Sequence, residues 1–267
     1  DEFGDTCLEM MQFSINPLPS YHTENIEVQY INEENYFDGI NIIDFESLSY
    51  SLAINKYGEV LWFADRNNFF SSRIITTQFL DNGNFIGFTT GRGYEFNKDS
   101  EIIFETPEGL NVHHHIIKTD HDTYFIIDAE IEYHPCPDEC DDQFSVLPVP
   151  WQGDRFIELN QNGEILWEWN TFDYYDPGDY DGVYYSEGIY GGSWNTAFGN
   201  VFRYDWTHVN AIAFSEEENA LYISCRHLSR ITKIDYNTGE IIWNMGLYMP
   251  SGEVGCGQNL GFTFQHS

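Results

Sequence analysis

The sequence predicts an all-β protein, specifically a β-propeller built from four-stranded blades. Three observations lead to this prediction: a five-residue phrase recurs along the chain, a hairpin-like turn precedes each copy, and strand-favouring residues are abundant. Aromatic residues make up 17% and hydrophobic residues 42% of the 267 residues. This is enough apolar material for a core, and it argues against global disorder.

The repeated phrase places the strands. It occurs as Gly-Glu-Val-Leu-Trp at 58–62, Ser-Glu-Ile-Ile-Phe at 100–104, Gly-Glu-Ile-Leu-Trp at 163–167 and Gly-Glu-Ile-Ile-Trp at 239–243. A turn containing Asn precedes each copy, and an alternating strand precedes three of the turns, as at 155–159 and 230–235. Alternation on both sides of a tight turn indicates a β-hairpin. We expect the Trp residues of the phrase to fill the core between blades.

A second hairpin is predicted upstream in each unit, and three of these hairpins serve as examples. These hairpins span 74–90, 116–128 and 211–224. Each unit therefore holds about four strands, and four-stranded units at intervals of a few dozen residues are typical of a propeller. We count four units, at 40–66, 70–108, 111–170 and 205–246, and a fifth that begins at Phe262. Long loops at 129–154 and 171–204 are natural places for functional insertions.

The domain organisation follows from the repeat. Residues 1–38 lack it and are predicted to form a small N-terminal β segment, whereas residues 39–267 form the propeller domain. Because the fifth unit has only just begun at Phe262, we expect this propeller to be incomplete, with its last blades missing. A chain that starts at Asp1 with no visible signal peptide predicts a processed or trimmed product. No apolar run approaches transmembrane length, so no membrane span is expected.

The charge balance excludes some partners. The chain has 44 acidic and 11 basic residues, for a formal net charge of −33. Such a surface repels nucleic acid and anionic membrane. Solvation is the simplest explanation of the acidity. Calcium binding in acidic loops such as 173–181 is the alternative, although the spacing there matches no EF-hand loop.

The cysteines bear on the compartment. They are Cys7, Cys136, Cys140, Cys225 and Cys256. A short disulfide between Cys136 and Cys140 is predicted, and it would indicate an oxidising compartment. A zinc site is the rival, but no second Cys pair stands at zinc-like spacing.

Unusual polar residues stand at the starts of the later units. In a propeller the first strand of each blade lines the central channel. The third unit opens with His113, His114 and His115, the fourth with Trp206, His208 and Asn210, and the fifth with Phe264, Gln265 and His266. We therefore expect imidazoles from three consecutive blades to converge on one pocket. Arg226 could serve an anionic ligand there, or it could be the ion-pair partner of Asp205.

The remaining histidines have simpler explanations. His227 follows Arg226 and is expected to alternate outward as a structural residue. His22, His121 and His134 fall in predicted turns or loops and are expected to be solvated. A zinc or copper site in the triple His is an alternative, but neighbouring residues of a strand point to opposite faces, so that only His113 and His115 would share it. No metal is predicted as part of the site.

Two motifs resemble a known family. Asp205-Trp206-x-His208-x-Asn210, then Ser224-x-Arg226-His227-Leu228-Ser229, resemble the arylsulfate sulfotransferases, as do the His pair and the Phe-x-Gln-His ending. The resemblance covers about residues 40–267. It implies a six-bladed propeller, commonly periplasmic or secreted. It also implies transfer of a sulfuryl group from an aryl sulfate to a phenol without a nucleotide sulfate donor, through a transiently sulfated histidine.

The resemblance also assigns roles. It implies that His266 is the nucleophile and that His208, Asn210 and Arg226 grip the sulfate and the phenolic oxygen. His114 resembles a further sulfate-binding position, with His113 as the alternative register. His113 and Trp206 are expected to bind substrate. The expected partners are small molecules, and an oligomer is compatible with the sequence. The alternative function is a non-catalytic extracellular binding or structural propeller.

The chemistry of these residue types agrees with sulfuryl transfer. A neutral imidazole is a good nucleophile. Sulfuryl transfer, like phosphoryl transfer, spreads negative charge over equatorial oxygens. The planar guanidinium of Arg226 matches such oxygens, Asn210 can donate an amide N–H, and His208 can carry a proton near neutral pH.

Overall fold

The described part of the chain is almost entirely β-structure. The computed structural model describes residues 26–29, 39–45, 50–135, 148–179, 204–252 and 262–266. Its helical elements are single turns: η1 (Arg66–Asn68), η2 (Phe70–Ser72), α1 (Thr171–Tyr174) and η3 (Arg226–Leu228). Within these ranges no helix has the length and apolar character needed to cross a membrane. The all-β prediction is therefore confirmed.

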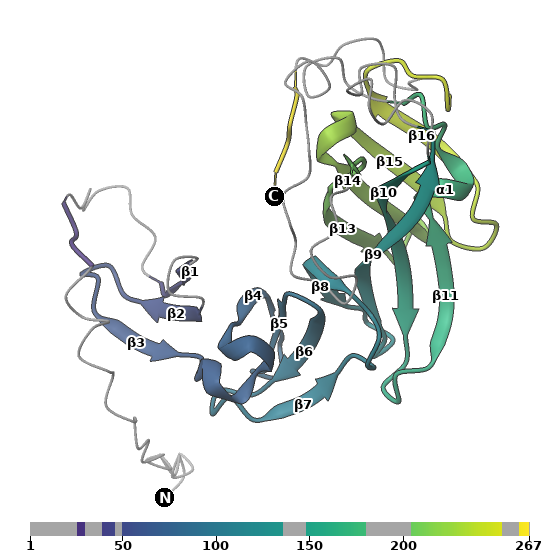
Figure 1. The fold of residues 1–267 in the computed structure, drawn as a ribbon. Coiled ribbons are helices and arrows are strands. Elements are labelled where there is room, and N and C mark those ends of the chain that lie inside the picture. The colour runs from purple at the N-terminus through teal and green to yellow at the C-terminus, as the bar shows by residue number, and fades with distance from the viewer. Residues whose placement is uncertain are drawn as a thin grey trace, which may run out of the picture.

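The strands form four sheets that follow one another along the chain (Figure 1). The first contains β1 (Asn41–Phe45), β2 (Tyr50–Ile54) and β3 (Val60–Phe63); the second contains β4 (Ile75–Phe79), β5 (Phe85–Thr89), β6 (Arg92–Phe96) and β7 (Ile102–Glu105). The third contains β8 (Val112–Lys118), β9 (Tyr124–His134), β10 (Val149–Leu159) and β11 (Ile165–Asn170); the fourth contains β13 (Val209–Ser215), β14 (Ala220–Cys225), β15 (Arg230–Asp235) and β16 (Ile241–Gly246). Within each sheet the strands pair antiparallel in sequence order, and each sheet falls inside one predicted unit.

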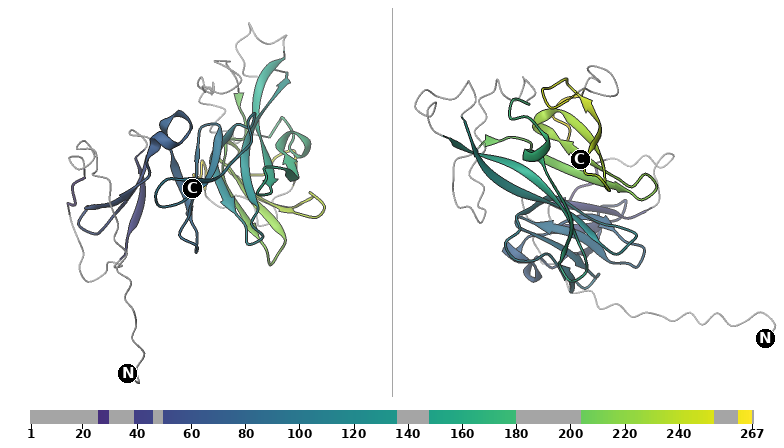
Figure 2. Two further views of the ribbon diagram at one scale, coloured as in Figure 1. Left: turned by 90° about the horizontal axis from the view of Figure 1, so that it is seen from below. Right: turned by 90° about the vertical axis from the view of Figure 1, so that its right-hand side faces the viewer.

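One short strand connects two units. β12 (Tyr204–Asp205) precedes the fourth sheet but pairs in parallel with β10 of the third sheet. The residues directly after β12 therefore begin their course beside the third sheet. Two further views show the same succession of sheets (Figure 2).

The turn that leads into the repeated phrase is held by an Asn side chain. Oδ1 of Asn160 accepts hydrogen bonds from the backbone N–H groups of Asn162 and Glu164, and Gly163 adopts a φ of 79°. The same arrangement surrounds Asn55 and Asn97. In the degenerate copy, Ser100 takes the left-handed position with a φ of 61°, which glycine adopts at lower cost.

The aromatic residue that ends the phrase joins neighbouring sheets. Trp62 stacks on Phe85, with ring centroids 4.3 Å apart, and its indole N–H donates to the carbonyl of Lys98 in the next unit. Trp167 likewise stacks on Tyr236 and donates to its carbonyl oxygen. The prediction that these residues fill the space between successive units is confirmed for both. Phe104 also stacks across sheets, and Tyr124 is its partner.

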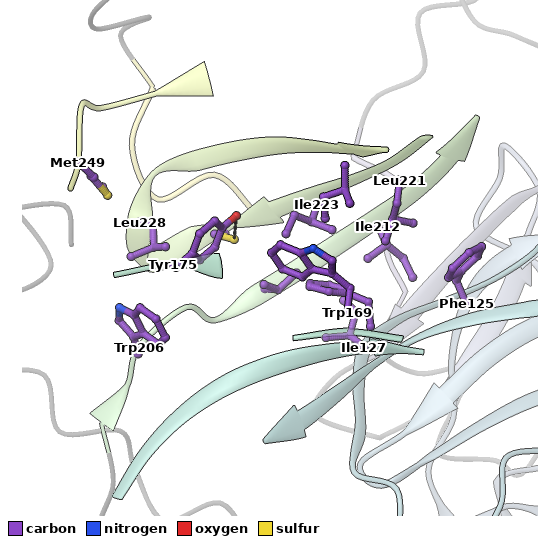
Figure 3. Packing of buried hydrophobic residues seen from close by; sticks show 14 of the residues in the cluster. Phe125, Ile127, Trp169, Tyr175, Trp206, Ile212, Leu221, Ile223, Leu228 and Met249 are labelled. Atoms are coloured by element: carbon purple, nitrogen blue, oxygen red, sulfur yellow. Dashed lines mark hydrogen bonds between the residues drawn. The ribbon is translucent and has the colours of Figure 1, made fainter. Parts of the chain in front are cut away.

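Buried hydrophobic residues form one cluster between each pair of successive sheets. The largest lies between the third and fourth sheets and contains Trp169, Trp206 and Tyr175 (Figure 3). Leu52 and Phe96 belong to the cluster between the first and second sheets. The second and third sheets each contribute to two clusters and the first and fourth to one, so the sheets stabilise one another in chain order.

Some predictions fall outside the described residues. Of the predicted N-terminal segment, the structure describes residues 26–29, which carry no regular strand. Cys136 and Cys140, the predicted disulfide, lie outside the described part. Cys225 is described, and it is a buried free thiol whose pKa is raised to about 12 by burial.

Candidate active site

Three imidazole rings from separate parts of the chain meet at one place. The ring centroid of His114 on β8 lies 4.8 Å from that of His208 and 5.5 Å from that of His266. The centroids of His208 and His266 are 6.5 Å apart. One ring nitrogen of each residue lies within 4.8 Å of the other two. His114 and His208 are partly buried whereas His266 is exposed, so the cluster is open to solvent on the His266 side.

A β-bulge turns His114 into the cluster. The register of β8 against β9 shifts between Val112 and Ile116, and His114 has a φ of 54°. A bulge re-aims side chains, and a left-handed non-glycine residue is a mark of functional sites. The strict alternation expected for the triple His is therefore wrong. Nδ1 of His113 lies 2.7 Å from Nδ1 of His114, and Nδ1 of His115 accepts a hydrogen bond from the fourth sheet, so His113 and His115 do not share a site.

The other two members of the cluster also stand beside unusual backbone. His208 has a φ of 45°, and the register of β13 against β14 shifts between Val209 and Ala211. Phe264, two residues before His266, has a φ of 51°. Three left-handed residues at one cluster mean that the surrounding structure, rather than local preference, holds these rings in place.

Asp205 orients His208. Its Oδ2 lies 2.5 Å from Nδ1 of His208, and the carboxylate is buried. Burial alone would raise the pKa of Asp205, but His208, together with His227 and His113, outweighs burial and holds the pKa at about 2. Because an ionised carboxylate only accepts hydrogen bonds, Nδ1 of His208 carries the proton and Nε2 is its basic nitrogen.

His113 supports His114 from behind. Nε2 of His113 lies 2.9 Å from Oδ1 of Asp154, within ion-pair distance although the N–H is not aligned on the oxygen. His113 is only 4% exposed and is placed to orient His114, and its predicted substrate-binding role stays a prediction. The pKa of His114 is lowered to about 2 by burial and by the neighbouring His113, His208 and His266, which keeps this imidazole neutral.

Asp154 also supports His208. Its Oδ2 accepts hydrogen bonds from the hydroxyl of Thr207 at 2.5 Å and from the backbone N–H of Val209 at 2.8 Å, the residues on either side of His208. Asp154 lies on β10 and is fully buried. The Asp154 carboxylate thus supports His114 through His113, and it supports His208 through the two residues beside it. No motif around Asp154 signals this role, because it arises from the pairing of β10 with β12.

His227 lies inside the site, and its predicted outward orientation is wrong. Its Nδ1 donates to the carbonyl oxygen of Asp205 at 2.6 Å, its Nε2 accepts from Arg226 at 2.8 Å, and its ring centroid lies 4.3 Å from that of His208. Residues 226–228 form the turn η3, so strand alternation does not apply. Burial lowers the pKa of His227 to about 4, even though Asp205 opposes that shift.

Arg226 stands at the edge of the cluster. Its guanidinium lies 5.1 Å from the ring centroid of Phe264, and one N–H donates to His227. The carboxylate of Asp205 pairs with His208 instead, so the alternative of an Arg226–Asp205 ion pair is not observed. Arg226 contacts the cluster through His227 and through the segment that carries His266.

Asn210 and Gln265 hold that segment against the fourth sheet. The side-chain amide of Asn210 donates to the carbonyl oxygen of Gln265 at 2.6 Å. The amide of Gln265 donates to the carbonyl oxygens of Cys225 and Arg230, each at 3.0 Å. These bonds link β13, β14 and β15 to the residue directly before His266.

Trp206 lies in the core, and its predicted role in substrate binding stays a prediction (Figure 3). It is 6% exposed, its indole N–H donates to the carbonyl oxygen of Asp179, and its ring packs edge-on against Trp151. In the acidic loop, the carboxylate of Asp179 accepts hydrogen bonds from Arg230 and Ser251, so it serves an internal ion pair. Of the histidines that were expected to be solvated in turns or loops, His121 is exposed, whereas His134 lies on β9 and stacks on Phe172. His22 lies outside the described residues.

The four successive antiparallel sheets and the imidazole cluster define an all-β repeat protein with a histidine-rich site. The model of one family, described as arylsulfotransferase (ASST), matches residues 22–248. The chain therefore belongs to the arylsulfotransferase family, a family of transferases.

No curated protein matches the chain. Solved structures with some similarity include a protein of unknown function from Bacteroides caccae (13% identity, TM-score 0.43, 78% of this chain and 57% of that one). Another is the dihydro-heme d1 dehydrogenase NirN (11% identity, TM-score 0.32, 80% of this chain and 46% of that one). A third is the WD40 domain of SCAP from fission yeast (10% identity, TM-score 0.22, 79% of this chain and 53% of that one). The chain spans about half the length of these structures.

Proposed function

We propose that this chain carries the site of an aryl sulfotransferase that moves a sulfuryl group from an aryl sulfate to a phenolic acceptor through a sulfohistidine. The observation that carries the proposal is the meeting of His114, His208 and His266, with His266 on the exposed side. Membership of the arylsulfotransferase family supports the reaction class.

The proposed first step uses His266 as nucleophile. A neutral ring nitrogen of His266 forms a bond to sulfur while the bond from sulfur to the aryl oxygen breaks, and the aryl group leaves as a phenolate or takes a proton from a nearby acid. In the second step the acceptor oxygen forms the new bond to sulfur, the sulfur–nitrogen bond breaks, and the phenolic proton passes to a base. His266 is regenerated, as a ping-pong cycle requires.

The proposed acid and base is His208. Nδ1 of His208 donates its proton to Oδ2 of Asp205, and the two atoms are 2.5 Å apart. This bond leaves Nε2 as the basic nitrogen, and the carboxylate stabilises the ring when it becomes protonated. His114 and Arg226 are the proposed partners of the sulfuryl oxygens. Removing one such donor commonly raises the barrier by about 2.7–4 kcal/mol.

We further propose that the four sheets are consecutive blades of a β-propeller. The strand order and the stacked aromatic residues between successive sheets support this, and in the resembling family six blades close the ring. In such an arrangement β8 and β13 are the inner strands, which explains why the cluster lies on and beside them. A secreted or periplasmic location, as in that family, is part of the proposal.

The test is transfer from 4-nitrophenyl sulfate to phenol by a protein that includes any remaining blades. We expect release of 4-nitrophenolate and, without acceptor, a trapped enzyme heavier by one sulfuryl group. His266→Ala should abolish the trapped species, while His121→Ala, at an exposed histidine outside the site, should retain it. No nitrophenolate release would refute the function, and a label on His208 or His114 would refute the assignment of His266.

A further inference from the structure

The three rings of the cluster are spaced like the ligands of a three-histidine metal centre. With a zinc–nitrogen bond of about 2.0–2.1 Å and tetrahedral angles, the centroids of two bound imidazoles lie roughly 5.2 Å apart. The observed separations among His114, His208 and His266 are 4.8, 5.5 and 6.5 Å. Only His266 needs to approach further, and it is the exposed member on a short segment.

The groups behind the rings are those of a metal site. Metal-binding histidines usually donate their second ring N–H to a carboxylate or another acceptor, which fixes the tautomer and orients the ring. Asp205 accepts from Nδ1 of His208, and Nδ1 of His113 faces Nδ1 of His114. In both rings Nε2 is therefore the nitrogen that would coordinate an ion.

The ligand set indicates the class of metal ion. Nitrogen-only ligands favour zinc, copper and nickel over the oxygen-seeking magnesium and calcium.

The neighbouring group of Asp205, His208 and His227 is a poorer candidate. Both ring nitrogens of His227 are engaged, Nδ1 by the carbonyl oxygen of Asp205 and Nε2 by Arg226. Binding a metal through His227 would break one of these bonds. This comparison places the ion among His114, His208 and His266.

We propose that His114, His208 and His266 bind one divalent transition-metal ion of the zinc class, with a fourth position open to water, and that this ion excludes aryl sulfate. Metal binding does not depend on the proposed sulfuryl transfer, whereas the exclusion of aryl sulfate does. A protein that uses His266 as a nucleophile would then be inhibited by the ion, because the metal takes the lone pair that attacks sulfur.

The first experiment measures zinc binding to the full chain by calorimetry, with excess magnesium present to occupy acidic surface sites. We expect one tight equivalent. Asp205→Asn removes a group that supports a ligand and should weaken zinc binding roughly 10–100-fold. His266→Ala and His114→Ala each remove a ligand and should weaken zinc binding at least as strongly. His121→Ala should leave the Kd unchanged. Cobalt should give the visible spectrum of a tetrahedral nitrogen-ligated ion, and it should lose that spectrum in His266→Ala.

Two outcomes would overturn the proposal. Zinc that binds His114→Ala and His266→Ala as tightly as the parent chain would lie elsewhere, on the acidic surface. Circular dichroism of His266→Ala, an exposed position, checks that a loss of binding is not a loss of folding. Sulfuryl transfer that is unaffected by one equivalent of bound zinc would refute the exclusion. A chain that binds zinc through these rings and, in its zinc-free form, transfers no sulfuryl group would keep the metal site and refute the proposed enzyme.

Discussion

Oδ2 of Asp205 lies 2.5 Å from Nδ1 of His208, and both residues belong to one short stretch of chain that enters the cluster beside the third sheet. The carbonyl oxygen of the same Asp205 accepts a hydrogen bond from Nδ1 of His227. One buried residue therefore sets the tautomer of two adjacent imidazoles. His208 keeps a basic Nε2, whereas Nε2 of His227 is engaged by Arg226.

The first prediction concerns Asp205→Asn. The amide removes the negative charge that favours the Nδ1–H tautomer of His208, so its action as acid and base should weaken. We expect kcat to fall by roughly 10²–10⁴-fold with a smaller change in KM. Kinetics with 4-nitrophenyl sulfate measure the fall, and nitrogen NMR of the ring reports the tautomer. Asp173→Asn, at an exposed carboxylate, is the control. An unchanged tautomer would contradict the role of Asp205.

The second prediction concerns Asp154, which accepts hydrogen bonds from Thr207 and Val209. Asp154→Ala leaves both buried donors without their acceptor and should lower the free energy of unfolding by about 3 kcal/mol or more, since bonds to a charged group contribute about 1.5–3 kcal/mol each. Asp154→Asn retains an acceptor oxygen and should lose less. Urea denaturation compares the two. An Asp154→Ala variant that is about as stable as the parent chain would mean that these bonds contribute little.

The third prediction concerns acid stability. Burial lowers the folded-state pKa of His114 to about 2 and of His227 to about 4, below the unfolded value near 6.5. The unfolded chain thus binds more protons below that pH, so this stabilisation is complete above pH 6.5 and declines as pH falls. Each group contributes a slope of up to about 1.4 kcal/mol per pH unit.

Chemical denaturation from pH 7.5 to 5.5, above most carboxylate titrations, measures this slope. His227→Gln should make the decline shallower, and His121→Ala should not change it. A free energy of unfolding that is constant over this range would show that the buried rings are accessible to protons in the folded protein.

The fourth prediction concerns the ion pair of Arg230 and Asp179, whose side chains are both fully buried and 2.9 Å apart. Arg230→Met leaves the Asp179 carboxylate without its cation and should lower the free energy of unfolding by about 3–5 kcal/mol. Adding Asp179→Leu removes the stranded charge and should recover much of the loss. Thermal and urea unfolding of the single and double variants test this. A double variant no more stable than the single would contradict it.

The fifth prediction concerns Gln265, whose amide donates to the carbonyl oxygens of Cys225 and Arg230. Gln265→Ala removes both bonds and frees the segment that carries His266. We expect a clear fall in kcat, since the nucleophile is no longer held in position. The cost in stability should be only about 0.5–1.5 kcal/mol per bond. Thr263→Ala, at an exposed position of the same segment, should behave like the parent chain. Unchanged kcat in Gln265→Ala would refute the positioning role.

Local sequence patterns were sufficient to predict the strands and turns of the four sheets. The Asn-x-x-Gly turn and the closing Trp of the phrase depend on neighbours within five residues and on a repeated contact with the next unit, and both appear in the structure at Asn160 and Trp167. The expected approach of His114, His208 and His266 likewise followed from equivalent positions in successive units. Equivalent strands of stacked sheets lie side by side, so a repeated sequence position becomes a shared place.

Local pattern failed where the backbone leaves the regular strand. Alternation predicted that His113 and His114 diverge and that His227 points outward, yet a bulge joins the first two and a single helical turn buries the third. Trp206 was expected at the site because it opens the fourth unit together with His208, and its indole N–H donates in the core to the carbonyl oxygen of Asp179.

The sequence by itself determined the all-β class, the four repeated units and the three imidazoles that meet, because each rests on periodicity and on turns of a few residues. The tertiary structure alone decided which ring each carboxylate supports. Asp154 reaches His113 and the flanks of His208 from strands more than 40 residues away along the chain, since sheet pairing brings β8, β10 and β12 together. Hydrogen bonds between such distant segments depend on register and bulges, which no local pattern encodes.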